Sequence, residues 1–320
     1  METREKYLQY EKNLVVNSAP HVGDKNSVRK IMGTVLIAMI PALIAGVYFF
    51  GIRAFILTLT AAAACVISEA IFQKLAKQKV TISDLSAVVT GVLIAFNVPV
   101  TMPVWQVIVG SVFAIVVVKQ MFGGLGKNFM NPALAARALL MASWPENMSA
   151  FTAPLSDSVS MATPLSGGEV ISNLDMFLGK MPGTIGEVSK LALLIGLAIL
   201  LFTKVIKIHI PAIYIGSTAL FYLLFRGLSG GFSEAFSEIP MQLLSGGLFL
   251  GAIFMATDYA TNPRTLKGKV IFALGCGFLT ALFRVFGGYP EGVSYAILLM
   301  NITVPLIDKK TVPVQFGGGK

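Results

Sequence analysis

Apolar residues gather along this chain into ten segments, and each segment is typical of a membrane-spanning helix. Several segments are shorter than the ~20 residues that a helix needs to cross the hydrocarbon core of a bilayer. Between the fifth and the sixth lies the one long polar loop, which is unusual in an otherwise apolar chain. The segments are residues 28–50, 53–73, 84–98, 104–121, 131–144, 187–206, 211–225, 240–257, 268–286 and 292–307, and the loop is residues 145–186.

The composition excludes a soluble domain. Of the 320 residues, 55% are hydrophobic and 13% are charged, and the mean hydropathy is +0.76, far from the balance of soluble proteins. The expected fold is an all-α integral membrane protein surrounded by lipid, with no nucleic-acid partner. Cys65 and Cys276 lie far apart, and nothing near His21 or His209 would complete a metal site.

Basic residues divide unequally between the two sides of the predicted membrane. With the amino terminus inside, nineteen of the 25 Lys and Arg residues fall on the inner side, Lys119 among them. Positive charge in short loops marks the cytoplasmic side, and Trp105 and Trp144 fall at predicted outer ends of segments, where their rings favour the interface. Both termini are therefore expected in the cytoplasm and residues 145–186 outside it. The five outer basic residues are Arg53, Lys180, Lys190, Arg226 and Arg284, while Arg137 lies within a segment.

A short internal repeat divides the ten segments into two halves of five. Residues 122–124, Phe-Gly-Gly, recur as residues 286–288, and Pro99 recurs as Pro263, both 164 residues later. An odd number of spans gives the halves opposite orientations, which is the inverted-repeat plan of many transporters. Chance similarity of Gly-rich membrane sequence is the alternative. The expected organisation is a cytoplasmic amino-terminal segment (1–27), a first five-helix repeat (28–144), the extracytoplasmic loop (145–186), a second five-helix repeat (187–308) and a cytoplasmic tail (309–320).

The shortest segments, the third and fifth with the eighth and tenth, hold corresponding positions in the two halves. Short or broken helices in such positions meet near the midplane of the membrane and bind something between the halves. The glycines Gly91, Gly246, Gly247 and Gly251 would let backbones approach closely there. Packing of short helices into the bundle interior, without any ligand, is the simpler interpretation and stays open.

The polar loop contains the run Asp157-x-x-Ser160-x-Ala162-Thr163, followed by Pro164. A threonine hydroxyl is a weak nucleophile that needs an activating base, and residues 145–190 contain neither His nor Cys. Modification of Thr163 would therefore require another enzyme, with Asp157 as a recognition or metal-bridging carboxylate. From these residues alone, ordinary turn chemistry before a proline is the favoured explanation of Ser160 and Thr163.

This run resembles the flavinylation motif of the membrane subunits of the Rnf complex and of the sodium-pumping NADH:quinone oxidoreductase. The resemblance covers nearly the whole chain, and the short amino-terminal extension is more similar to the Rnf D subunits than to the longer quinone-reductase B subunits. One departure is Met161, where the family usually has Gly. The other similar stretches are residues 83–91, 123–133, 255–258, 287–293 and 298–301.

The resemblance implies a multi-pass subunit of an ion-translocating ferredoxin:NAD oxidoreductase in the bacterial cytoplasmic (inner) membrane. It implies FMN joined through its phosphate to the hydroxyl of Thr163 by a dedicated flavin transferase, with Asp157, Ser160 and Ala162 completing the motif. It also implies a second, non-covalent flavin (riboflavin) between the helices, coupling to Na⁺ or H⁺ transport, and the other Rnf subunits (A, B, C, E and G) as partners. The chain has no cysteine set for an iron–sulfur cluster and no dinucleotide fingerprint, so it would be one relay and not catalytic alone.

Ionisable residues in or beside the segments are candidates for ion coupling, because intramembrane charge usually faces a cavity or a partner. Glu69, Asp84 and Asp258 lie near predicted cytoplasmic ends of segments, and Arg137 lies within one. Snorkelling to the interface explains Glu69 and Asp84 equally well.

Three other interpretations stay open. One is a B-type subunit of the Na⁺-translocating NADH:quinone oxidoreductase. Another is a solute channel or transporter, since inverted repeats of five helices with short helices at the midplane resemble the urea-transporter fold. The third is a structural membrane subunit whose motif has decayed at Met161.

Overall fold

The computed structural model describes residues 27–155, 160–167, 171–287 and 291–312. Helices dominate these residues, which confirms the all-α class apart from one hairpin of two-residue strands. Each of the ten predicted segments contains helix. The first half contains α2 (Val28–Phe50), α3 (Ile52–Leu75), η1 (Ile82–Asp84), α4 (Ser86–Phe96), α5 (Val104–Phe113), its continuation as the π-helix η2 (Ala114–Gln120), and α6 (Pro132–Ser143).

The long loop and the second half complete the element order. The loop contains α7 (Pro145–Ser149), β1 (Phe151–Thr152), β2 (Ser160–Met161), the 3₁₀ turn η3 (Pro164–Ser166) and α8 (Asn173–Leu178). The second half contains α9 (Lys190–Phe202), α10 (His209–Gly230), α11 (Phe232–Leu244), α12 (Leu248–Leu250), its continuation as the π-helix η4 (Gly251–Met255), α13 (Leu266–Phe286) and α14 (Val293–Thr311).

Four helices in the described part of the chain, α2, α3, α10 and α13, are long and apolar enough to cross a membrane. A fifth span follows if α11 and the α12–η4 helix count as one, since they meet at a bend of 63°. The helices α4, α5–η2, α6 and α9 are apolar but shorter. Helix length and composition therefore indicate an integral membrane protein, while the number of ten spans stays a prediction.

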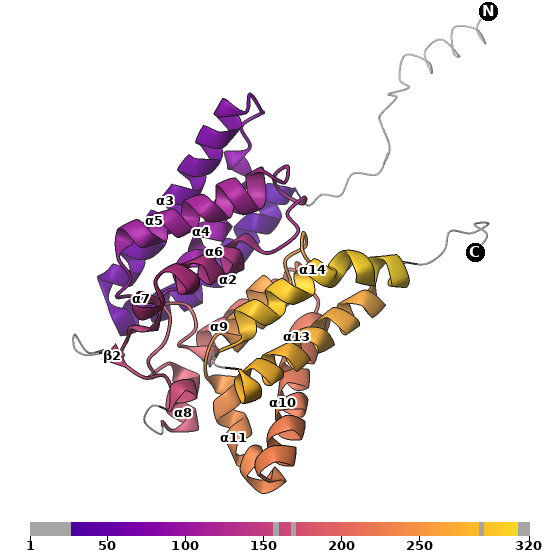
Figure 1. Ribbon diagram of the computed structural model, residues 1–320. Coiled ribbons are helices and arrows are strands. Elements are labelled where there is room, and N and C mark those ends of the chain that lie inside the picture. The colour runs from indigo at the N-terminus through magenta and orange to yellow at the C-terminus, as the bar shows by residue number, and fades with distance from the viewer. Residues whose placement is uncertain (1–26, 156–159, 168–170, 288–290, 313–320) are drawn as a thin grey trace, which may run out of the picture.

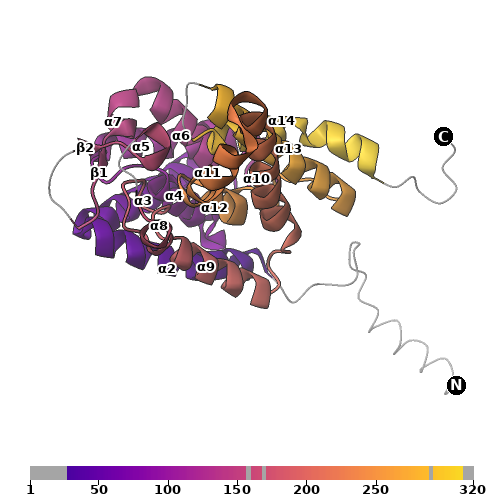
Figure 2. The same ribbon diagram turned by 90° about the horizontal axis from the view of Figure 1, so that it is seen from below.

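The helices gather into two groups, with α3 to α6 on one side and α10 to α14 on the other (Figure 1). In the first group α3 packs against α4 and α5, and in the second α10 packs against α11 and α13, so the packing order is shared. The groups meet where α2 lies beside α9 (Figure 2) and where α6 contacts α14. In both views α7, β2 and α8 lie at the end of the molecule opposite the start of α2 and the end of α14.

Local sequence explains the elements that shape the space between the groups. Asn131 caps α6, because its side-chain oxygen accepts the N–H groups of Ala133 (3.0 Å) and Leu134 (3.3 Å), and Pro132 suits the first helical position. Gly91 lets α4 lie directly on α3, since a Cβ at this position would come within 2.5 Å of the Ala62 Cα. Small residues at helix contacts allow such close approach in membrane proteins.

Candidate functional site

The loop residues predicted to carry a cofactor lie in a hairpin followed by a tight turn. β1 pairs antiparallel with β2, so that Thr152 lies opposite Ser160. Thr163 precedes the turn η3 in extended backbone and is 6% exposed, whereas Ala162 is exposed. Asp157 lies outside the described residues. Because Thr163 is buried, attachment of a group as large as FMN would require this turn to move.

The turn η3 packs against the break between α11 and α12. A Cβ on Gly246, which lies in that break, would come within 2.9 Å of Leu165 Cδ1 and 3.4 Å of Arg284 Nη2. Leu165, two residues after Thr163, therefore contacts the break between α11 and α12. Beside the break lie five charged residues, called here the outer cluster: Arg137, Glu187, Lys190, Arg284 and Glu291.

Two cations of the outer cluster satisfy the carbonyl groups that the break leaves open. Arg284 donates to the carbonyl oxygens of Ser245 (3.3 Å) and Glu291 (3.3 Å), and Lys190 Nζ donates to that of Gly246 (3.4 Å). Non-helical backbone inside a membrane is tolerated only where protein groups satisfy it. The sequence analysis counted Lys190 and Arg284 as charges of the outer side. The structure instead buries Lys190 completely and half-buries Arg284.

Arg137 connects the two groups of helices within the outer cluster. Its Nη1 donates to Asn97 Oδ1 at the end of α4 (2.8 Å), and its Nη2 forms an ion pair with Glu291, which precedes α14. Glu187 is 1% exposed, and its Oε2 has no hydrogen-bond partner in the described part of the chain. A Cβ on Gly247 would lie 3.3 Å from that oxygen and 3.6 Å from Arg137 Nη1. Arg137 therefore borders two carboxylates but pairs with one.

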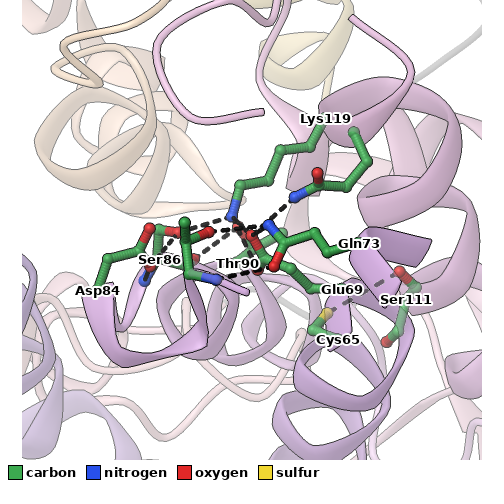
Figure 3. Close-up of polar contacts among 10 residues, drawn as sticks. Cys65, Glu69, Gln73, Asp84, Ser86, Thr90, Ser111 and Lys119 are labelled. Atoms are coloured by element: carbon green, nitrogen blue, oxygen red, sulfur yellow. Dashed lines mark hydrogen bonds and ion pairs between the residues drawn. The ribbon is translucent and has the colours of Figure 1, made fainter. Parts of the chain in front are cut away.

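A second group of polar side chains, called here the inner cluster, lies between α3, α4 and η2 (Figure 3). Lys119 Nζ donates to both carboxylate oxygens of Glu69 (3.1 and 3.0 Å) and to Ser86 Oγ (2.6 Å). Glu69 Oε1 also accepts the side-chain amides of Gln120 (2.7 Å) and Gln73 (3.3 Å). Lys119 is 2% and Glu69 1% exposed. Snorkelling is thus wrong for Glu69, and Lys119 is no surface charge.

Asp84, which is half-buried, lies next to the inner cluster. Its Oδ1 accepts the Ser86 backbone N–H (2.8 Å) and the Ser86 hydroxyl (2.6 Å), so this carboxylate satisfies the first N–H group of α4. The predicted candidate Asp84 is therefore linked to Lys119 through one hydroxyl group.

A cleft between the two groups of helices opens beside the inner cluster. Its deeper part, about 90 Å³, is lined by Ser86, Lys119 and Asn131 among others, and its wider part, about 540 Å³, by Asn301 among others. The wider part has the size of a small-molecule site. The two parts share Ile31, Met32, Leu125, Asn128, Asp258, Tyr259 and Ala260.

Asp258 lies in the turn after η4 and faces both parts of the cleft. Its carboxylate accepts the Ala260 N–H (3.3 Å) and the Thr261 hydroxyl (3.1 Å). Burial raises the pKa of Asp258 above its ordinary value, and these two bonds and the charge of Lys119 oppose that rise. Asp84 and Asp258, predicted independently, thus approach the same cleft, while Arg137 lies in the other cluster.

The model of a protein family described as NQR2, RnfD, RnfE matches residues 15–317 of the chain. The chain belongs to this family. The expected resemblance is therefore confirmed. Other members of the NQR2, RnfD, RnfE family are similar to this chain over nearly their whole length.

One such relative is the D subunit of the Na(+)-translocating ferredoxin:NAD(+) oxidoreductase complex of Acetobacterium woodii, 49% identical over 316 residues, or 96% of each chain. The D subunit of the proton-translocating ferredoxin:NAD(+) oxidoreductase complex of Clostridium ljungdahlii is 42% identical over 327 residues, 97% of this chain and 98% of its own. The D subunit of the ion-translocating oxidoreductase complex of Escherichia coli O9:H4 is 34% identical over 350 residues, 95% and 99% of the two chains. These names differ in the transported ion. Similarity within the NQR2, RnfD, RnfE family therefore does not show which ion this chain would be coupled to.

Much of both clusters is not predicted from the sequence of this NQR2, RnfD, RnfE family member. Glu187 and Lys190 lie at the start of the segment 187–206 and Glu291 adjoins the segment 292–307, so the rule that singles out Arg137 applies to them as well. The place of a charged residue along the sequence does not show whether its side chain points into the protein. The packing of α3, α4 and η2 was needed to bring Glu69 and Lys119 together.

Proposed function

We propose that this chain is the D subunit of an ion-translocating ferredoxin:NAD oxidoreductase complex, in which it relays electrons and is not catalytic alone. The observation that carries this proposal is similarity over at least 95% of both chains to three D subunits. Two are named as subunits of ferredoxin:NAD(+) oxidoreductase complexes, and the third is named as a subunit of an ion-translocating oxidoreductase complex. Its partners would be the other subunits of the complex, A, B, C, E and G in the Rnf naming. The chain has two cysteines, too few for an iron–sulfur cluster, so its electron carrier must be an added cofactor.

The proposed carrier is FMN esterified to Thr163 by a flavin transferase. Support comes from the run that ends at Thr163 and from the place of this residue in the long loop, between β2 and the turn η3. The cations of the outer cluster lie behind the turn η3, which suits a site for a phosphorylated group. The bound flavin would supply the redox chemistry, and the chain would hold it and set its electrostatic surroundings.

Substitution Thr163→Val tests the FMN proposal, because it keeps the shape of the side chain and removes the hydroxyl. Covalent flavin, seen as fluorescence of the band in a denaturing gel, is expected to vanish while the protein stays in the membrane. Ser160→Ala is the matched control and should keep the fluorescence. Fluorescence that survives in Thr163→Val, or a flavin-bearing peptide that maps to Ser160 or Thr152, would contradict the assignment.

We also propose that the cleft holds the second, non-covalent flavin. Its wider part is large enough for a small-molecule ligand, and Asn128, Asn301 and Asp258 offer hydrogen-bonding groups along mostly apolar walls. This arrangement fits a flat, apolar ring with polar edges. Acid extraction of the purified complex should release about one riboflavin for each copy of this chain. Because this flavin is not covalently bound, it should give no fluorescent band in a denaturing gel.

The finer architecture belongs to the same proposal. Ten spans in two inverted halves, residues 28–144 and 187–308, are supported by the shared packing order and by the contact of α6 with α14. Both termini would be cytoplasmic and residues 145–186 extracytoplasmic. Asp84 and Asp258 beside the cleft, and Arg137 between the halves, are the proposed ion-coupling residues.

A further inference from the structure

Three side chains form a continuous hydrogen-bonded path from the edge of the molecule at η1 into the cleft (Figure 3). Lys119 Nζ donates to Ser86 Oγ over 2.6 Å, and the Ser86 hydroxyl donates to Asp84 Oδ1 over 2.6 Å. Asp84 is half-buried, while Ser86 and Lys119 are 4% and 2% exposed and line the deeper part of the cleft. The path therefore joins a carboxylate that meets solvent to an ammonium group that meets the cleft.

The surroundings of Lys119 allow it to lose a proton without leaving its partner unsatisfied. Glu69 accepts the side-chain amides of Gln120 and Gln73 as well as the ammonium group. If Lys119 became neutral, two amide donors would remain on this carboxylate, which lessens the penalty of a buried unpaired charge. The titratable groups around Lys119 are Cys65 and Glu69 from α3, Asp84 from η1 and Asp258 from the turn after η4.

The position of Lys119 in its helix also favours a functional role over a structural one. It lies near the end of η2, the π-helical continuation of α5, and π-helical turns occur frequently at functional sites. A buried ion pair adds little net stability compared with apolar residues of similar size. The Lys119–Glu69 pair is therefore poorly explained as a stabilising contact.

We propose that Asp84, Ser86 and Lys119 conduct protons from the surface at η1 to an acceptor in the cleft. The Lys119 ammonium gives one proton to the acceptor. The Ser86 hydroxyl then turns toward the neutral amine and gives it a proton, while the Ser86 oxygen takes a proton from Asp84, which solvent hydronium has protonated. The ammonium, the hydroxyl and the carboxylate are thereby restored. The net change is one proton moved from solvent to the cleft, with only N–H and O–H bonds broken and formed.

This inference rests on the proposed second flavin, which names the acceptor. An isoalloxazine ring binds protons at its nitrogen atoms when it takes up two electrons, and the electrons would come from the relay of the complex. A ring edge that extends from the wider into the deeper part of the cleft needs a path for those protons there, because the walls of the deeper part are mostly apolar. The path through Ser86 ends at the wall of the same cleft.

Substitution Ser86→Ala tests the path, because it removes the central hydroxyl and leaves the Lys119–Glu69 ion pair intact. Asp84→Asn is the second variant, since its amide oxygen still accepts from Ser86 but cannot carry a proton. Ser86→Thr keeps a hydroxyl at the same place. Ser111→Ala is the matched control, because the buried Ser111 hydroxyl lies outside the path and donates to the Val107 carbonyl (2.8 Å).

The measurement is photoreduction of the purified whole complex, carrying Thr163→Val to remove the covalent flavin of this chain, in ordinary and in heavy water. Ser86→Ala and Asp84→Asn should slow reduction of the acid-extractable flavin about a hundredfold, the lower end of the range for a lost proton-transfer group, and change its isotope effect. Ser86→Thr and Ser111→Ala should stay within about twofold of the parent.

Four outcomes separate the possibilities. Slowing confined to Ser86→Ala and Asp84→Asn, at unchanged flavin content, supports the path. Equal rates in all variants would overturn it, and so would loss of extractable flavin in Ser86→Ala, since Ser86 would then be a binding group. A parent complex without extractable flavin overturns both the path and the second flavin, whereas failure of the Thr163 assignment leaves the path standing.

Discussion

Arg137 illustrates at the scale of a single residue how a charge is kept inside this protein. Its guanidinium group donates to Asn97, forms an ion pair with Glu291 and borders Glu187 without pairing with it. Burying a charged group costs free energy, and removing its partner from the buried pair costs more. Its role in joining the two helix groups follows from these contacts.

Arg137→Gln should therefore destabilise the protein strongly. The change leaves the half-buried Glu291 without its paired cation and removes the positive charge that borders the buried Glu187. Breaking a buried pair costs about 3–5 kcal/mol. The double variant Arg137→Gln/Glu291→Gln should recover part of this loss. The free energy of unfolding, measured by titration with denaturing detergent in mixed micelles, provides the check.

Arg226→Gln is the matched control for that measurement. Arg226 also pairs with a carboxylate, Glu238 (Nε–Oε2, 3.2 Å), but the two side chains are 35% and 30% exposed. Exposed pairs contribute little, because water solvates both partners. Equal losses for Arg137→Gln and Arg226→Gln would mean that burial of Arg137 is not what makes its pair important.

At the scale of elements, close contact between helices depends on a few glycines. Gly91→Ala places a Cβ within 2.5 Å of the Ala62 Cα and 2.7 Å of the Ala61 carbonyl oxygen, and these backbone atoms move only if α4 leaves α3. We expect a loss of about 1–3 kcal/mol in the free energy of unfolding, the usual cost of overpacking. Ser86 lies on α4, so the rate of flavin reduction should fall as well.

Gly216→Ala is the control at this scale. Gly216 also lies inside a helix, α10, but a Cβ there meets no atom within 4 Å. Alanine favours a helix over glycine by about 0.5–1 kcal/mol, so this variant should be at least as stable as the parent. If Gly216→Ala lowered the free energy of unfolding as much as Gly91→Ala, the loss would come from replacing a helical glycine in general and not from the contact of α4 with α3.

At the scale of the whole molecule, the two ends differ in what they carry. The start of α2 and the end of α14 lie at one end, and the loop elements lie at the other. Trp105 and Trp144, predicted at outer segment ends, contact each other with ring centroids 5.1 Å apart. The arrangement agrees with termini on one side of a membrane and the loop on the other.

A single cysteine at position 150 tests this topology. Ala150→Cys, in a background without Cys65 and Cys276, should react with an impermeant maleimide from outside intact cells, because Ala150 is in the long loop next to β1. Cysteines at Lys77 and Lys309 should react only after the cells are opened. Labelling of position 150 only in opened cells would show that the protein has the opposite orientation in the membrane.

The positions of the helices and the family of the chain can be predicted from the order of the amino acids alone. In lipid every backbone group must be satisfied within its own helix, so apolar runs specify helices almost without reference to the rest of the fold. The caps follow equally locally, as at Asn131 before Pro132. The family likewise rests on linear stretches that need no folding to be recognised, and the run ending at Thr163 stays a prediction of the same kind.

Which charged side chains point inward, and which partners they contact, depends on how the helices pack. Lys119 and Lys190 each lie near the end of an apolar segment, where a charge can face either water or the interior. The ion pair of Lys119 with Glu69 needs η2 to pack on α3, and the contact of Lys190 with Gly246 needs the break in the second half. A buried charge is stable only where packing supplies its partners, and those partners lie about fifty residues away in the chain.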